Sequence, residues 1–430
     1  MTNPVSIMIL LGGFFFLMAL KVPIAFALGL SAFASALYHG VPLTAIALNM
    51  INGVNSFTLI AIPFFIIAGN LMGEGGIADR LISLADICVG RVRGGLAMVN
   101  VLSSKFFGTV SGSAVADTSA LGTVLIPLMV KQGYDREFAV ANTVSSSIIG
   151  LLIPPSHNML IFAMAAGGGI SIAALFMAGI VPAIIAGFGL MAVSYIVARR
   201  KNYPKSRKYG LKESIKIFFQ SMVGMMTIVI IVGGIVSGVF TATEASVAAV
   251  VYAFLITFFV YREIPLRHFW VVMKKSLRTV AIVMVIISAS SAFGFMMALL
   301  QVPGMFANAL LSISDNPIIV LILINVILLI LGLFMDMAPM ILIGTPILLP
   351  IATSMGMHPV QFGIVMLLNL GLGLITPPVG TVLFVGCSVG KAKVESVIKP
   401  LLPYYFALFV ALMLITFIPS LTMWLPSLLV

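Results

Sequence analysis

Two short stretches place paired prolines inside runs of apolar residues: Pro154-Pro155 in "GLLIPPSHNMLIF" and Pro377-Pro378 in "GLITPPVGTVLFV". A proline pair removes two backbone donors and clashes with the preceding turn, so it interrupts a helix. The interruption leaves backbone N–H groups and carbonyls without intrahelical partners. In lipid, such backbone is tolerated only where it lines a cavity or binds something. Free N–H groups suit an anion, and unwound carbonyls and hydroxyls suit Na⁺.

A second polar interruption precedes each proline pair. "GTVSGSAVADT" lies within 94–130, and "GLFMDMAPMILIGTP" lies within 317–355. We predict that each stretch is a re-entrant hairpin of two half-helices, whose tip faces the proline break in the same half of the chain. Glycine and small hydroxyl residues suit a hard monovalent cation, so two tip-and-break pairs predict two Na⁺ ions with the solute between them. The residues of the first pair are Ser111, Gly112, Ser113, Thr118, Ser156 and Asn158, and those of the second are Asp336, Thr345, Thr376, Gly380 and Thr381.

The composition indicates that these stretches belong to a polytopic helical membrane protein. Hydrophobic residues make up 61% of the 430 residues and charged residues 8%, and the mean hydropathy is +1.22. In a soluble domain about a quarter of the residues are charged. Apolar runs long enough to cross a hydrocarbon core of about 30 Å recur along the chain. We predict spans at 4–20, 22–38, 55–73, 137–166, 171–198, 218–240, 242–261, 279–300, 360–390 and 397–428.

The basic residues predict how these spans are oriented. If the segment Arg199–Lys216 is cytoplasmic, the other Lys and Arg residues also fall inside, apart from Lys105 within a hairpin. This is the distribution that the positive-inside rule requires. Both termini then lie outside, and the net charge of +11 is a positive-inside bias rather than a nucleic-acid surface. The loops left outside contain no Lys or Arg, and they are 39–54, 167–170, 301–316 and 356–359.

The proline pairs also belong to an internal repeat. At an offset of 223 residues, eight of the 41 positions from 127 to 167 are identical, and six of these are Pro or Gly. Each half contains three spans, a hairpin, a broken span and a last span. A hairpin enters and leaves on the same side, so each half crosses the membrane five times. Because five is odd, the second half is inverted relative to the first. Inverted repeats with broken helices are typical of secondary transporters. We predict an all-α fold of two inverted repeats, 1–198 and 218–430, joined by a basic linker at 199–217.

Several longer motifs resemble a known family. "GTVSGSAVADTSALG", "IPPS", "GVFTATEAS" and "GLFMDMAPMILIGTPILLPI" followed by "GLGLITPPVGTVLFV" are similar to the large membrane subunit of tripartite ATP-independent periplasmic (TRAP) transporters. The resemblance runs through essentially the whole chain. It implies an elevator mechanism in the bacterial inner membrane, in which a transport domain moves against a scaffold of spans within 1–73 and 218–300. The transport domain would contain the hairpins 94–130 and 317–355 and the broken spans 137–166 and 360–390.

The resemblance also implies partners and ligands. The expected partners are a separate small four-span membrane subunit and a soluble periplasmic binding protein that delivers the solute. The expected function is Na⁺-coupled symport of an organic anion, not catalysis. Because the sequence after the first proline pair is Ser156-His157-Asn158, it looks more like members that handle sialic acid or sugar acids than like C4-dicarboxylate members. The site carried over assigns Na⁺ to Ser111, Gly112, Ser113, Pro154, Asp336, Thr345, Thr376 and Gly380, and the solute to Ser111, Ser113, Ser156, Asn158 and Thr381.

Ionisable residues near these sites each have two interpretations. Asp336 either binds Na⁺ or caps a half-helix. The first interpretation follows because an ionisable group at membrane depth is a functional candidate by default. Lys105 and Asp117 are expected to pair across the first hairpin, with Lys105 facing the solute as the alternative. His157 either forms a polar wall of the site or titrates and couples protons. Glu244 is expected to cap a scaffold span or to contact the small membrane subunit, rather than to bind an ion.

Other classes of function are kept as alternatives. A proton-coupled transporter of the same fold is one, and an intramembrane enzyme with Asp117 and Asp336 as an acid/base pair is another. An ion channel fits less well, because two dead-end hairpins predict alternating access rather than a continuous pore. No GxxxxGK[ST] phosphate loop occurs in the chain, so ATP hydrolysis is not expected.

Overall fold

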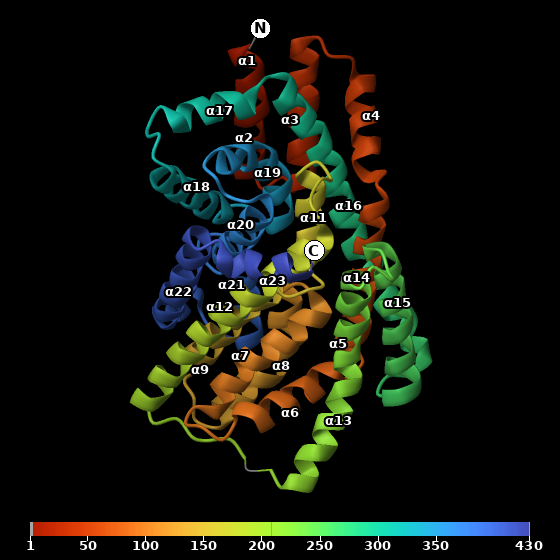
Figure 1. Cartoon of the computed structure of the whole chain (residues 1–430), viewed down its shortest axis with the longest axis vertical. Coiled ribbons are helices and arrows are strands. Elements are labelled where there is room, and N and C mark those ends of the chain that lie inside the picture. Colours follow the sequence, from red (N-terminus) through yellow and green to blue (C-terminus); the bar gives the residue numbers. More distant parts are fainter. Residues whose placement is uncertain (1–2, 208, 430) are drawn as a thin grey trace.

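The computed structural model describes residues 3–207 and 209–429, and the elements within them are helices (Figure 1). The first half contains α1 (Pro4–Ile7), η1 (Met8–Gly12), α2 (Gly13–Ala19), α3 (Ile24–His39), α4 (Leu43–Val54), η2 (Phe57–Ile60), α5 (Ala61–Glu74), α6 (Ile77–Val89), α7 (Gly95–Ser111), α8 (Ala114–Lys131), α9 (Arg136–Ser147), α10 (Ile149–Leu152), α11 (His157–Ala165) and α12 (Ile172–Arg200). The second half contains α13 (Leu211–Ile228), η3 (Val229–Gly233), α14 (Gly234–Val236), α15 (Ala242–Leu255), η4 (Ile256–Tyr261), η5 (Leu266–His268), α16 (Phe269–Leu299), α17 (Val302–Leu311), α18 (Pro317–Gly332), α19 (Met337–Ser354), α20 (Pro359–Leu374), α21 (Thr381–Gly390), α22 (Val394–Phe417) and α23 (Ser420–Leu429).

The helices have the length and composition of membrane spans. Among the described residues, seven helices are long and apolar enough to cross a bilayer, and nine spans result if each of two bent pairs counts as one. In one pair α5 meets α6 at 70°, and in the other α9–α10 meets α11 at 51°. The second bend is the predicted break at Pro154-Pro155. The chain is therefore the polytopic all-α membrane protein that its composition predicts.

The offset of 223 residues recurs in the helix boundaries. Helices α8 and α19 begin at Ala114 and Met337, and α9 and α20 begin at Arg136 and Pro359. The peptide bond within each proline pair is cis. The two hairpins, α7–α8 and α18–α19, are pairs of helices in the predicted positions. The backbone of the second half thus repeats the order of the first half, with its breaks in the same register.

Two helices lie where we expected external loops. The stretch 39–54 contains α4, which packs against α16, and the stretch 301–316 contains α17, which packs against α19. Their 12 and 10 residues are too few to cross a bilayer, so a search for spans overlooks them. A proline marks the start of each helix, Pro42 before α4 and Pro303 in the first turn of α17. Proline is favoured there because the first turn has no intrahelical use for its N–H.

Helices from the two halves interlock in two groups. In the first, called the scaffold group, α3, α4 and α5 pack against α16, and α5 also packs against α15. In the second, called the hairpin group, α11 packs against α19 and α20, while α21 packs against α8 and α9. The helix after each proline break is therefore held by helices from the other half of the chain. Neither half forms a separate unit.

The two hairpins lie in opposite halves of the molecule along its long axis. Figure 1 shows α7 and α8 (orange) in the lower half, near the segment that joins α12 to α13. Helices α18 and α19 lie in the upper half, with α17 and the N-terminus. This is the arrangement that inverted repeats require, whereas the orientation of the chain in a membrane stays a prediction.

One predicted helix cap is confirmed. The Glu244 carboxylate accepts a hydrogen bond from the backbone N–H of Thr241 at 2.8 Å, and the Thr241 hydroxyl accepts one from the Glu244 N–H at 3.3 Å. This reciprocal capping box satisfies two donors at the start of α15. Glu244 is therefore a cap in the scaffold group.

Candidate functional site

The tip of the first hairpin lies directly against the first proline break. Gly112, between α7 and α8, has φ +57°, and a Cβ added to it would lie 2.6 Å from the carbonyl oxygen of Pro155 and 3.3 Å from the Cα of Ser156. Glycine is needed at this position for both its left-handed backbone and its lack of a side chain. The next residue, Ser113, caps α8 by accepting a hydrogen bond from Ala116 at 3.4 Å. The predicted contact between tip and break is therefore present in the first half.

Both hairpins also approach their breaks through a pair of glycines. A Cβ on Gly108 of α7 would lie 2.3 Å from the Cα of Gly150 in α10. In the second half, a Cβ on Gly373 of α20 would lie 2.6 Å from the carbonyl carbon of Gly332 in α18. Small residues let helix backbones approach this closely in a membrane. The same backbone contact therefore recurs in the two halves.

Buried hydroxyls follow both proline pairs. The Ser156 side chain is fully buried, and its Oγ has no hydrogen-bond partner among the described residues. The Oγ1 of Thr381, at the start of α21, is also buried and unpartnered within the described part of the chain. Asn158, the second residue of α11, is 4% exposed. Buried polar groups are normally hydrogen-bonded, so the two free oxygens are candidates to contact a ligand.

The other second-half candidates have local partners. Asp336 is exposed and caps α19, because its Oδ1 accepts a hydrogen bond from the N–H of Met337 at 2.9 Å. The Thr345 hydroxyl is buried, 3.5 Å from the sulfur of Met366. The Thr376 hydroxyl donates to the carbonyl of Leu372 at 2.7 Å. Asp336 therefore caps α19, as one of its two interpretations predicts. Its role as a Na⁺ ligand stays a prediction.

The expected pairing of Lys105 with Asp117 is wrong. Asp117 on α8 is fully buried, and both of its carboxylate oxygens lack a hydrogen-bond partner among the described residues. Its Oδ2 would lie 3.5 Å from a Cβ on Gly150. Lys105 is partly buried on α7 and forms no ion pair within the described residues. The packing of α8 on α10 places Asp117 against the backbone of the broken span instead.

A cavity of about 470 Å³ lies between the first hairpin and the scaffold group. Ser111 and Ser113 line it from the hairpin tip, and His157 lines it from the start of α11, as its interpretation as a polar wall predicts. Ser156, Asn158 and Thr381 are not among the lining residues. The remaining polar lining comes from Asn70 and Glu74 of α5, Ser119 and Thr123 of α8, and Lys275 and Thr279 of α16.

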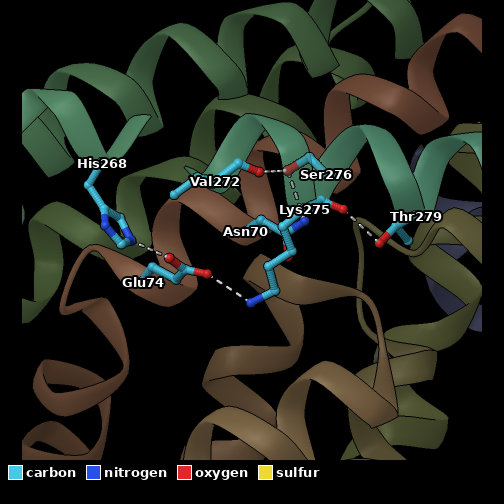
Figure 2. A network of polar contacts seen from close by, with 7 residues as sticks. All are labelled: Asn70, Glu74, His268, Val272, Lys275, Ser276 and Thr279. Atoms are coloured by element: carbon cyan, nitrogen blue, oxygen red, sulfur yellow. Dashed lines mark hydrogen bonds and ion pairs between the residues drawn. The ribbon is translucent and has the colours of Figure 1, made fainter. Parts of the chain in front are cut away.

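The scaffold side of this cavity carries a polar network, drawn in Figure 2. The Lys275 Nζ donates to Glu74 Oε1 at 2.8 Å, and the His268 Nε2 lies 2.8 Å from Glu74 Oε2. One turn deeper, Asn70 Nδ2 donates to the Ser276 hydroxyl at 3.0 Å. Each contact joins the end of α5 to the segment η5–α16. The network thus ties together two helices that are about 200 residues apart in sequence.

Sequence reasoning missed the residues of this network. Lys275 entered only as one of the cytoplasmic basic residues, and Glu74 lay just beyond the predicted span 55–73. Only the positions of Glu74 and Lys275 could have indicated a role, because each is a charged residue where an apolar run meets a charged segment. Which of the many such residues face a cavity depends on how α5 packs on α16.

The two repeats interlock, each has a hairpin packed closely on its broken span, and a polar cavity lies beside the first hairpin tip. This is the architecture of a secondary transporter. The comparison with known proteins agrees. Residues 11–421 match the family described as "Tripartite ATP-independent periplasmic transporter, DctM component", and the chain belongs to this family. It is a subunit of a multi-pass membrane transporter that does not use ATP, and it is not an enzyme.

Individual relatives support the same assignment. The chain is 45% identical to the uncharacterized protein YgiK of Salmonella typhimurium, over 98% of this chain and 97% of the relative. It is 37% identical to the sialic acid TRAP transporter large permease protein SiaM of Vibrio cholerae, over 89% of each chain. It is 38% identical to the isethionate TRAP transporter permease protein DctMQ of Oleidesulfovibrio alaskensis, over 96% of this chain and 65% of the relative.

Solved structures resemble the fold at lower identity. The YdaH transporter of Alcanivorax borkumensis matches with a TM-score of 0.61 at 14% identity, over 87% of each chain. MtrF of Neisseria gonorrhoeae matches with a TM-score of 0.59 at 15% identity, over 89% of this chain and 83% of MtrF. At this identity the likeness concerns the fold alone.

Proposed function

We propose that this chain carries out Na⁺-coupled symport of an organic anion. The observation that carries the proposal is the seating of the first hairpin tip on the first proline break, with the free oxygens of Ser156 and Thr381 after the two proline pairs and a polar cavity beside the first tip. Inverted repeats with broken helices place ions and solute at such sites.

The solute is an organic acid, with sialic acid or another sugar acid, or a C4-dicarboxylate, as the candidates. Several relatives are named for organic acids: sialic acid, isethionate, C4-dicarboxylate and 2,3-diketo-L-gulonate. A cavity of about 470 Å³ has room for acids of this size. The hydroxyls of Ser111 and Ser113 and the ammonium of Lys275 are donors suited to an acid group.

Two Na⁺ ions drive the symport in this proposal, one at each tip-and-break pair. Na⁺ binds oxygen atoms, and the tips and breaks offer backbone carbonyls and the hydroxyls of small residues. In the first half the ligands would come from Ser111, Gly112, Ser113 and Pro154, and in the second half from Asp336, Thr345, Thr376 and Gly380. The buried Thr118 hydroxyl of α8, also unpartnered within the described residues, is a further oxygen close to this region.

Alternating access would occur by an elevator movement of the hairpin group against the scaffold group. The cavity lies at the boundary between the two groups, so a sliding movement there would change which side of the membrane the solute reaches. The partners would be a small four-span membrane subunit and a soluble periplasmic binding protein. The location would be the bacterial inner membrane, with both termini in the periplasm.

Proton coupling is the second candidate, because Asp117 is a fully buried carboxyl with no partner among the described residues. A buried carboxylate without a counter-charge is costly, and binding a proton removes that cost.

Uptake into liposomes tests both candidates. The chain would be reconstituted with its small membrane subunit and offered sialic acid or a C4-dicarboxylate on a matching binding protein, with and without an inward Na⁺ gradient. Uptake that requires the Na⁺ gradient and the binding protein is the expected result. Uptake driven equally by a proton gradient alone would replace Na⁺ coupling with the second candidate.

A further inference from the structure

Glu74 uses its two carboxylate oxygens for two different partners at the rim of the cavity. Oε1 accepts a hydrogen bond from Lys275, and Oε2 contacts His268, each at 2.8 Å (Figure 2). Among the described residues that line the cavity, Glu74 and Lys275 are those with a formal charge at pH 7. The one cation of this part of the wall is thus paired with a carboxylate of the protein itself.

This ion pair is weak enough to exchange. The Lys275 side chain is 60% exposed and that of Glu74 26% exposed. Ion pairs with such access to water contribute about 0.2–1 kcal/mol. The helices that the pair joins have a second link, since Asn70 of α5 donates to Ser276 of α16. The Glu74–Lys275 contact is therefore not needed to hold α5 on α16.

We propose that Lys275 binds the acid group of the solute and that Glu74 is its resident competitor. The inference rests on the proposed transport of organic anions. When a carboxylate or sulfonate enters, the Lys275 ammonium exchanges Glu74 Oε1 for the solute. Glu74 keeps its contact with His268 through Oε2, so the exchange does not leave a partly buried carboxylate without a partner.

The rest of the cavity can hold the body of the solute. The Ser111 and Ser113 hydroxyls lie on the hairpin side, and Thr279 lies one turn beyond Lys275 on α16. The acid group would thus be bound from the scaffold group and the polar body from the hairpin tip. This division makes Lys275 a determinant of affinity for acids rather than of the coupling ion.

The test is the Michaelis constant of uptake by the reconstituted complex, with sialic acid, isethionate, a C4-dicarboxylate and 2,3-diketo-L-gulonate as probes. For a transported acid, Glu74→Gln should lower KM by about twofold to fivefold, because it removes the competitor. Lys275→Gln should raise KM about tenfold or more, since it removes a charge-assisted hydrogen bond. The KM of Lys275→Arg should stay near that of the wild type. The KM of the double variant, Glu74→Gln with Lys275→Gln, should match that of Lys275→Gln alone.

A purely structural pair predicts a different pattern. Both single variants would then raise KM or lower thermal stability together, and that result would overturn the inference. The matched control is Glu263→Gln, because Glu263 pairs with Arg80 at 2.6 Å and neither residue lines the cavity. Its KM should equal that of the wild type.

A second measurement separates this inference from the proposed function. Thr279→Cys, with Cys88 and Cys387 replaced by Ser, would be alkylated with an uncharged maleimide while inorganic sulfate is titrated. Sulfate should protect the cysteine at position 279 from alkylation. This protection should need less sulfate when Glu74→Gln is added, and it should be absent when Lys275→Gln is added. If none of the four acids is transported but sulfate protects in this order, the solute assignment fails and the exchange at Lys275 stands. If an acid is transported but sulfate protects equally with and without each variant, the exchange at Lys275 is wrong and the transport function stands.

Discussion

Gly112 and Pro155 are in such close contact that a Cβ on Gly112 would lie 2.6 Å from the Pro155 carbonyl oxygen. The two residues belong to the hairpin tip and to the broken span, which the chain joins only through α8, α9 and α10. Their contact brings the polar tip to the depth of the break. It explains why the tip requires a glycine at position 112.

We expect Gly112→Ala to reduce uptake strongly. The new methyl group would meet Pro155 and would occupy a left-handed conformation, which costs about 1 kcal/mol even without the clash. Because the tip would have to move, uptake should fall while the protein still assembles. Gly133→Ala is the control, since Gly133 also has a positive φ but has open space around its Cβ position. Equal losses in both variants would point to backbone strain alone.

Asp117→Asn should leave the free energy of unfolding unchanged or raise it by about 1 kcal/mol, because a neutral amide replaces a buried carboxyl without a partner. Thermal unfolding in detergent measures this directly. A clear loss of stability would show that the carboxylate is paired in the membrane. If uptake by the variant no longer responds to a proton gradient, proton coupling through Asp117 gains support.

Ser156→Ala and Asp336→Ala should differ in their effect on the Na⁺ dependence of uptake. Asp336 is expected to contribute to the second Na⁺ site, so its replacement should raise the Na⁺ concentration needed for half-maximal uptake. Ser156 is expected to contact the solute, so its replacement should act mainly on the solute KM. The reverse pattern would reassign the first break to the cation.

Tyr404→Phe should lower stability by about 1 kcal/mol, since hydrogen bonds between membrane helices contribute about 0.6 kcal/mol each. The Tyr404 hydroxyl lies 3.1 Å from both Asn142 Nδ2 and Ser194 Oγ, and the three residues join α22, α9 and α12. The melting temperature in detergent is the measurement. Transport at low temperature should be preserved, and its loss would give this buried network a functional role.

Asp135, in the loop between α8 and α9, should make stability depend on acid pH. Its hydrogen bond with Lys201 holds the pKa of the Asp135 carboxyl below its usual value. A lowered folded-state pKa contributes stability above the unfolded pKa, and this contribution is lost as the pH falls through the folded value. Asp135→Asn should therefore melt slightly below the wild type at pH 7, and the difference should shrink steadily as the pH falls below the usual pKa of an aspartate. A difference that stays constant or grows as the pH falls through the acid range would contradict the role of this ion pair.

Local chemistry in the sequence determined the hairpins, the two breaks and the offset between the halves. Pro154-Pro155 and Pro377-Pro378 interrupt helices wherever they occur, because proline lacks the N–H that a helix needs. Glycines such as Gly112 determine where the backbone can turn or approach another helix. These effects act within a few residues, so they can be predicted without knowledge of the fold. The short helices α4 and α17 were not predicted, because their apolar stretches are too short to cross a bilayer and a search for spans passes over them.

Only the tertiary structure decided which polar residues share the cavity. Ser111 and Ser113 were predicted because they lie beside an interruption, but Glu74 and Lys275 are about 200 residues apart and meet only through the packing of α5 on α16. The same packing left Asp117 without the partner that its spacing from Lys105 suggested. Side-chain pairing across helices depends on their rotation and depth, and these are set by the close contact of whole surfaces.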